Sequence, residues 1–80
     1  MIEKLGPWLI ENGFRETSFS IGVNLDERYC ILFNYSNMKY EVFYSERGNK
    51  TNLMKFENEK DAAQYFKDLI GKSVTARDIY

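Results

Sequence analysis

The sequence predicts an α+β fold with the element order α-β-β-β-β-α. The strands form an antiparallel meander in one layer, and both helices form the second layer on one face of the sheet. Three observations lead to this fold class. Apolar residues recur every three or four positions near both ends, apolar and polar residues alternate through the middle, and short polar turns separate the alternating runs. A chain of 80 residues has the length of a single domain, residues 1–80.

An N-terminal helix is expected from apolar residues at helical spacing: Ile2, Leu5, Trp8 and Leu9. Gly13 suits the position that follows a helix ending at Asn12. A proline inside a helix costs about 3 kcal/mol, so Pro7 limits where this helix begins. The helix therefore either begins near Glu3 or covers only residues 7–12.

Alternation with a period of two predicts strands in residues 19–25, 28–35 and 39–47. Polar turns at residues 26–27 and 36–37 join these strands. Gly48 and Asn49 both tolerate positive φ, so this pair predicts a tight hairpin turn. The hairpin leads to a fourth strand over residues 51–56.

The C-terminal helix is expected to follow Asn58, whose side chain can accept a hydrogen bond from the first helical turn. Asp61 adds negative charge near the positive end of the helix dipole. The apolar stripe of the helix comprises Ala62, Ala63, Phe66, Leu69 and Ile70. Gly71 ends the helix. In residues 73–80 we expect a short turn from Thr75, with the last two residues packed against the body.

The alternation assigns the strand side chains to two faces. The face under the helices is expected to hold Phe19, Ile21, Val23, Ile31, Phe33, Val42 and Tyr44. The margin of the other face is expected to hold Ser20, Asn24, Asn34, Glu41, Ser45 and Arg47. Leu32 and Phe43 lie at the centre of this second face, where an apolar patch with a polar rim has the anatomy of a protein-binding hot spot. Alternatively, the C-terminal tail or a homodimer covers the patch.

The residue types that most catalytic and metal sites need are scarce. The chain contains no histidine and a single cysteine, Cys30, which lies in an apolar run and is expected to be buried. The glycines are dispersed and form no phosphate-binding loop. We therefore expect no enzymatic activity, no catalytic residue, no metal and no cofactor.

The net charge of −1, with lysine and arginine scattered along the chain, argues against nucleic-acid binding. A module similar to double-stranded RNA-binding domains is a lesser alternative, because residues 57–61 are mostly acidic where such domains carry basic residues. No segment is apolar enough for a signal peptide or a membrane span. The unpaired cysteine favours a reducing compartment, so we expect a cytoplasmic protein without membrane contact.

Two stretches of the C-terminal half resemble small bacterial immunity proteins. They are Tyr40-x-Val42-x-Tyr44-x-Glu46-Arg47-Gly48 and Phe56-x-x-Glu59-x-Asp61-Ala62-x-x-Tyr65-Phe66. Immunity proteins are encoded beside polymorphic or contact-dependent toxins and neutralise them in the cytoplasm. The resemblance implies a stoichiometric inhibitor without catalytic activity, often of a nuclease toxin.

Under this resemblance, acidic and aromatic side chains would fill a basic cleft of the toxin, and complementary charge would raise the association rate. The predicted partner-binding residues are Asp26, Glu27, Leu32, Glu41, Phe43, Glu46 and Arg47. Alternatively, Glu46 pairs with a neighbour of Arg47 and only stabilises the hairpin. A homo-oligomeric or adaptor domain is the second interpretation of the whole chain.

Overall fold

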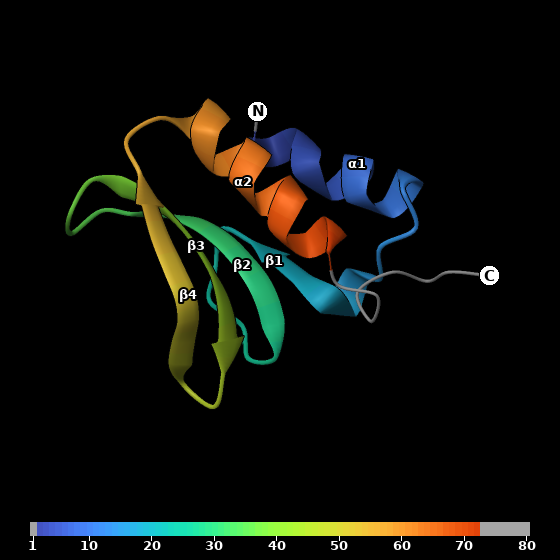
Figure 1. The fold of residues 1–80 in the computed structure, drawn as a ribbon, viewed down its shortest axis with the longest axis horizontal. Helices are drawn as coiled ribbons and strands as arrows, with labels where there is room; N and C mark the ends of the chain where they lie inside the picture. The colour runs from blue at the N-terminus through green and yellow to red at the C-terminus, as the bar shows by residue number, and fades with distance from the viewer. Residues whose placement is uncertain (1, 73–80) are drawn as a thin grey trace.

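A computed structural model describes residues 2–72 as an α+β fold with a four-stranded mixed sheet and two α-helices (Figure 1). The predicted fold class is confirmed at this level. In chain order the elements are the 3-10 helix η1 (Ile2–Lys4), α1 (Leu5–Glu11), the 3-10 helix η2 (Glu16–Ser18), β1 (Phe19–Ile21), β2 (Arg28–Asn34), β3 (Lys39–Glu46), β4 (Asn49–Phe56) and α2 (Glu59–Gly71). The turn expected in residues 73–80 lies outside the described residues.

The strands follow one another across the sheet in the order β1-β2-β3-β4. β2, β3 and β4 form antiparallel pairs, as the short turns between them require. β1 instead pairs with β2 in parallel, with Phe19 opposite Tyr29 and Ile21 opposite Ile31. The prediction of a fully antiparallel meander is therefore wrong at its first strand.

The parallel pairing depends on residues 22–27, which we call the crossover. Gly22 begins it with φ of 94°, a left-handed conformation that glycine adopts without steric penalty. The Ser20 hydroxyl donates to the carbonyl of Val23 at 2.8 Å, and the Cys30 thiol lies 3.6 Å from the carbonyl oxygen of Leu25. β1 is only three residues long, so the six residues of the crossover suffice to return the chain to the start of β2. The strand predicted over residues 19–25 therefore ends early.

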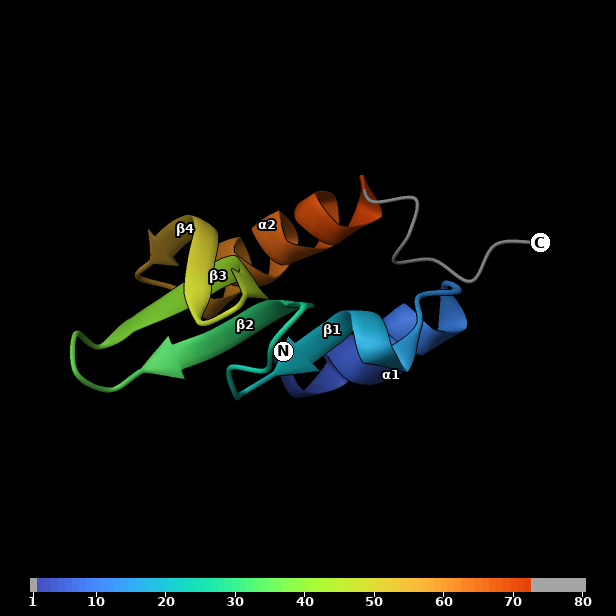
Figure 2. The same cartoon turned by 90° about the horizontal axis from the view of Figure 1, so that it is seen from below.

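One cluster of buried apolar side chains joins both helices to the sheet. Its members are Leu5, Leu9, Phe14, Phe19, Ile31, Val42, Ala62, Ala63, Phe66 and Ile70. Figure 1 shows α1 and α2 next to each other, and Figure 2 shows the same fold from below. Val23, which was expected in this core, lies in the crossover and is exposed.

The two helices begin for different local reasons. Pro7 is the third residue of α1, within the first turn, where backbone N–H groups have no partner inside the helix. The proline is therefore tolerated, and η1 extends the helical path back to Ile2. At α2, the side chain of Asn58 accepts a hydrogen bond from the backbone N–H of Asp61 at 2.8 Å, which confirms the predicted cap.

The β3–β4 hairpin turns one residue earlier than the sequence suggests. Glu46 pairs with Asn49, so the two turn residues are Arg47 and Gly48, and β4 begins at Asn49. Both turn residues have positive φ, 50° at Arg47 and 81° at Gly48, as a type I′ turn requires. The prediction of Gly48 and Asn49 as the turn pair is therefore wrong, although Gly48 still has the role assigned to it.

Replacement of Gly48 by alanine is expected to lower the free energy of unfolding by about 1–2 kcal/mol, because alanine is strained at positive φ. The matched control is Gly71→Ala at the end of α2, where an added Cβ meets no atom within 4 Å. This control should leave the stability unchanged or raise it by up to about 1 kcal/mol. Urea denaturation of both variants measures the difference, and equal losses would contradict the assigned turn.

Candidate functional site

The sheet face that carries Phe43 is closed at its centre by the chain itself. Phe43 and its cross-strand neighbour Cys30 are both 0% exposed. The prediction that Phe43 forms an exposed apolar centre is therefore wrong. Leu32 is half-buried and lines a shallow hollow with Ile21 and Phe33.

Lys50 closes this face together with the crossover. It pairs with Ser45 across the β3–β4 ladder, which places its side chain on the same face as Phe43. Its ammonium lies 4.9 Å from the centroid of the Phe43 ring and 3.2 Å from Oε1 of Glu41. The Lys50 ammonium thus lies over the aromatic ring and also reaches a carboxylate.

Glu41 is buried and fully engaged within the chain, with 2% of its surface exposed. Its Oε2 accepts hydrogen bonds from the side-chain amides of Asn34 at 3.0 Å and Asn37 at 3.2 Å, in addition to the Lys50 contact. Burial acts to raise the pKa of Glu41, but the hydrogen bonds from both asparagines and from Lys50 outweigh it, so the pKa lies below its ordinary value. Glu41 therefore stabilises the sheet and presents no free carboxylate to a partner.

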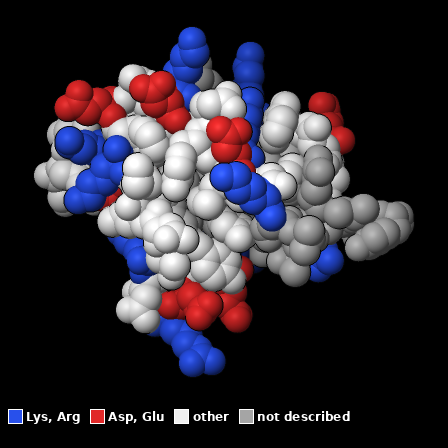
Figure 3. All heavy atoms as spheres, in the orientation of Figure 1, with Lys and Arg blue, Asp and Glu red and all other residues white. Residues whose placement is uncertain are grey.

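Asp26, Glu27 and Glu46 come together at the tip of the β3–β4 hairpin, and we call this group the acidic end. Figure 3 shows acidic side chains gathered at the bottom of the molecule, where Figure 1 places the hairpin turn. All three residues are exposed. Within residues 2–72, no lysine or arginine lies within ion-pair distance of their carboxylates. Two separate segments of the chain thus supply one exposed patch of negative charge.

The acidic end is held by backbone contacts between the crossover and the hairpin. The N–H of Glu27 donates to the carbonyl of Ser45 at 2.6 Å, and the N–H of Gly48 donates to Oδ1 of Asp26 at 3.2 Å. Glu27 and Arg47 both adopt left-handed φ, 59° and 50°, which is uncommon outside glycine. These contacts fix an unusual backbone in place, so the carboxylates are positioned before any partner binds.

The negative field of the acidic end reaches the neighbouring tyrosine. Burial raises the pKa of Tyr44, and the charges of Glu46, Glu27 and Asp26 raise it further. Arg47 is exposed at the hairpin tip and is the one cation among the predicted partner-binding residues.

Exposed apolar side chains also lie next to the acidic end, although they differ from those that the sequence suggested. Val23 and Leu25, both in the crossover, are 56% and 42% exposed. They were missed because their alternation with polar residues is typical of a strand. Gly22 was the available indication of a break, since glycine within a strand often marks a bend.

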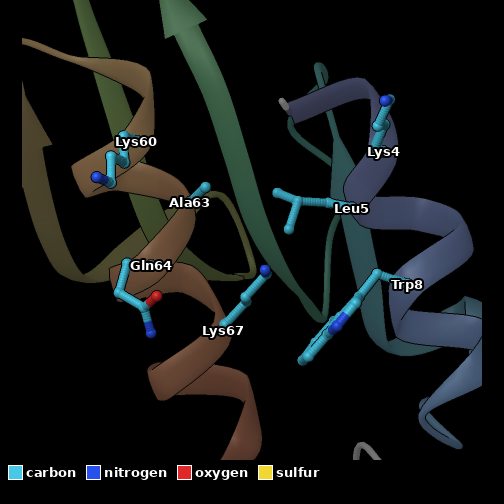
Figure 4. Close-up of a pocket in the computed structure, with 7 residues that line it drawn as sticks. All are labelled: Lys4, Leu5, Trp8, Lys60, Ala63, Gln64 and Lys67. Carbon is cyan, nitrogen blue, oxygen red and sulfur yellow. The ribbon is translucent and has the colours of Figure 1, made fainter.

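A second surface feature is the groove between α1 and α2, shown in Figure 4. Its volume is about 360 Å³, and it is lined by Lys4, Leu5, Trp8, Lys60, Ala63, Gln64 and Lys67. Lys67 points from α2 toward α1, and Leu5 and Trp8 point from α1 toward α2. The spacing of Lys60, Gln64 and Lys67 could have indicated one polar face of a helix, but the sequence could not show that it lies beside Trp8.

Among residues 2–72, no group of acidic, cysteine or histidine side chains could hold a metal ion. In the same residues, no helix has both the length and the apolar content that crossing a bilayer requires. Comparison of the chain with protein-family models, with curated proteins and with solved structures found no match.

Proposed function

We propose that the chain is a non-catalytic binding protein that neutralises a toxin domain by forming a stoichiometric complex with it. The observation that carries this proposal is the acidic end, where Asp26, Glu27 and Glu46 stand exposed without ion-pair partners among the described residues. A basic surface, such as the nucleic-acid cleft of a nuclease, is the complementary partner. The resemblance of residues 40–48 and 56–66 to immunity proteins favours the same function.

The geometry suits such a complex in two further ways. Val23 and Leu25 place apolar surface beside the carboxylates, which supplies contact area that charge alone does not. The crossover is tied to the hairpin by the Glu27 and Gly48 backbone N–H groups, so little conformational entropy is lost on binding. In this proposal Val23 and Leu25 take the role that the sequence assigned to Phe43.

The test uses the candidate toxin domain encoded beside the gene of this chain, because immunity proteins and toxins are encoded together. The wild-type chain is expected to form an equimolar complex with that domain and to restore growth of cells that express it. The variant Asp26→Asn/Glu27→Gln/Glu46→Gln should bind about 10–100-fold more slowly at low salt, since charge complementarity mainly raises the association rate. Stopped-flow or surface-plasmon-resonance kinetics measure the change.

The matched control is Glu11→Gln/Glu16→Gln/Glu57→Gln, which removes the same charge from exposed positions elsewhere. It should associate at nearly the wild-type rate. Equal slowing of both variants would contradict the acidic end as the binding site. Absence of any complex or protection with the wild-type chain would instead contradict the function, and a homo-oligomer in size-exclusion chromatography would favour the adaptor interpretation.

A further inference from the structure

The groove between α1 and α2 combines apolar walls with positive charge. Leu5 and Ala63 supply buried apolar surface, and the indole of Trp8 is 36% exposed. Lys4, Lys60 and Lys67 are the charged residues in the lining, and no carboxylate belongs to it. The local charge is therefore positive, although the net charge of the whole chain is −1.

Lys67 is already positioned at the centre of this groove. Its ammonium lies 4.6 Å from the centroid of the Trp8 ring, within the range of a cation–π contact. Such a contact uses one side of the ammonium and leaves its other N–H groups free to donate to an anion. Within residues 2–72, Lys67 forms no ion pair with a carboxylate.

A second aromatic contact, with Phe14, holds the Trp8 ring in place. The two rings are stacked, with centroids 6.4 Å apart and an interplanar angle of 23°. Phe14 itself is buried in the core. The indole is thus a fixed wall of the groove, against which an apolar or aromatic group can pack without further ordering of the protein.

Lys4 and Lys60 stand at the two rims, Lys4 at the end of η1 just before α1 and Lys60 on α2 (Figure 4). Both side chains are exposed, so rotation about their single bonds can move either ammonium over the groove. Neither forms an ion pair with a carboxylate in the part of the chain that the structure describes. An anion in the groove would therefore meet ammonium groups from both of its sides, from η1 and from α2.

We propose that this groove binds a small phosphate-bearing ligand with an apolar or aromatic body, of about the size of a nucleotide. The ammonium groups match a phosphate, for which lysine serves as a point-charge donor. Leu5, Ala63 and Trp8 match the body of such a ligand. The volume of about 360 Å³ falls in the range of small-molecule sites.

A nucleic-acid strand fits this groove less well than a small ligand. A strand gains affinity by neutralising many phosphates in a row, which requires a continuous basic track. Here the groove lining supplies only three lysines, and the acidic end would repel an extended polyanion. Free nucleotides and other phosphorylated metabolites share the required features, because each combines a phosphate group with an apolar or aromatic body.

ATP and inorganic phosphate are the probes for the test, and the indole N–H of Trp8 is the reporter. The chain contains a single tryptophan, so its indole gives one side-chain signal in a ¹⁵N–¹H NMR spectrum. ATP is expected to shift that signal in a saturable way, and inorganic phosphate at the same concentration should shift it much less. The variant Lys60→Gln/Lys67→Gln should weaken ATP binding by about tenfold or more, because two charge-assisted hydrogen bonds are lost.

The matched control is Lys55→Gln/Lys72→Gln, which removes the same charge from exposed positions outside the groove lining and should bind ATP like the wild type. Lys4→Gln leaves the Lys67–Trp8 contact intact and gives a second test from the opposite rim of the groove, with an expected loss of several-fold. The proposal is overturned if ATP produces no saturable shift or if the control loses as much affinity as the groove variant. It is also overturned if phosphate alone binds as well as ATP, or if an oligonucleotide binds where ATP does not.

Discussion

Replacement of Phe43 by alanine is expected to lower the free energy of unfolding by about 3–5 kcal/mol. The Phe43 ring is 0% exposed, although the sequence places it at the centre of an open sheet face. Its removal would leave a cavity beneath Lys50, whose ammonium now lies over the ring. A domain of 80 residues has a total stability of about 4–12 kcal/mol, so this variant should be close to unfolding at room temperature.

Urea denaturation followed by circular dichroism measures the loss. Tyr35→Ala is the matched control, because it removes an aromatic side chain that is 81% exposed, and it should change the stability by less than about 0.5 kcal/mol. A Phe43→Ala variant as stable as this control would contradict the sealed second face. It would then support the original prediction that the ring is available to a partner.

Replacement of Glu41 by glutamine is expected to lower the free energy of unfolding at neutral pH by about 1–3 kcal/mol. The amide keeps the shape of the side chain but removes the charge that accepts from Asn34, Asn37 and Lys50. Lys50 is partly exposed, so water replaces part of the interaction that its ammonium loses in this variant. The loss of stability therefore stays below the loss expected for a fully buried ion pair.

The same variant should change how stability depends on pH. The folded protein holds the pKa of Glu41 below its ordinary value of 4.5, so the unfolded chain binds the proton more readily. The stabilising contribution of this carboxylate is complete above the unfolded pKa and is lost as the pH falls through the folded one. The difference in stability between wild type and Glu41→Gln should therefore shrink on acidification below the ordinary value.

Chemical denaturation of both proteins at a series of pH values from neutral to acidic provides the comparison. Glu57→Gln is a suitable control, because Glu57 is exposed and its contact with Lys39 is long, at 3.9 Å. This control should follow the wild-type pH profile closely. A constant difference between wild type and Glu41→Gln down to strongly acidic pH would contradict a lowered pKa.

Local sequence patterns were sufficient to predict the two α-helices and the four strands, although β1 is shorter than expected and η2 was not predicted. The Asn58 cap and the apolar stripe of α2 depend on interactions within a few residues, and both are present in the structure. Alternation over residues 28–34 and 39–46 likewise predicted β2 and β3, because their side chains face a core on one side. The sequence predicted that Asp26, Glu27 and Glu46 bind a partner through their negative charge. It did not predict that the three carboxylates lie together at the hairpin tip.

The pairing direction of β1 could not be predicted, because alternation in residues 19–25 is equally compatible with a strand that continues and with one that stops at Gly22. Hydrogen bonds from the Ser20 and Cys30 side chains to carbonyls of the crossover, and the short return to Arg28, fix the parallel pairing there. The same crossover leaves Leu25 exposed, while Phe43 is buried under Lys50. The exposure of a side chain depends on which distant segment covers it, and this information is absent from the period of the pattern.

By itself, the sequence determined the α+β class, the identity of the helices and strands, and the absence of histidine chemistry, because these follow from composition and short-range spacing. Only the tertiary structure decided the parallel start of the sheet, the closure of its second face and the placement of Lys67 beside Trp8. These features arise from contacts between segments far apart in the chain, whose free energies depend on how the whole molecule packs.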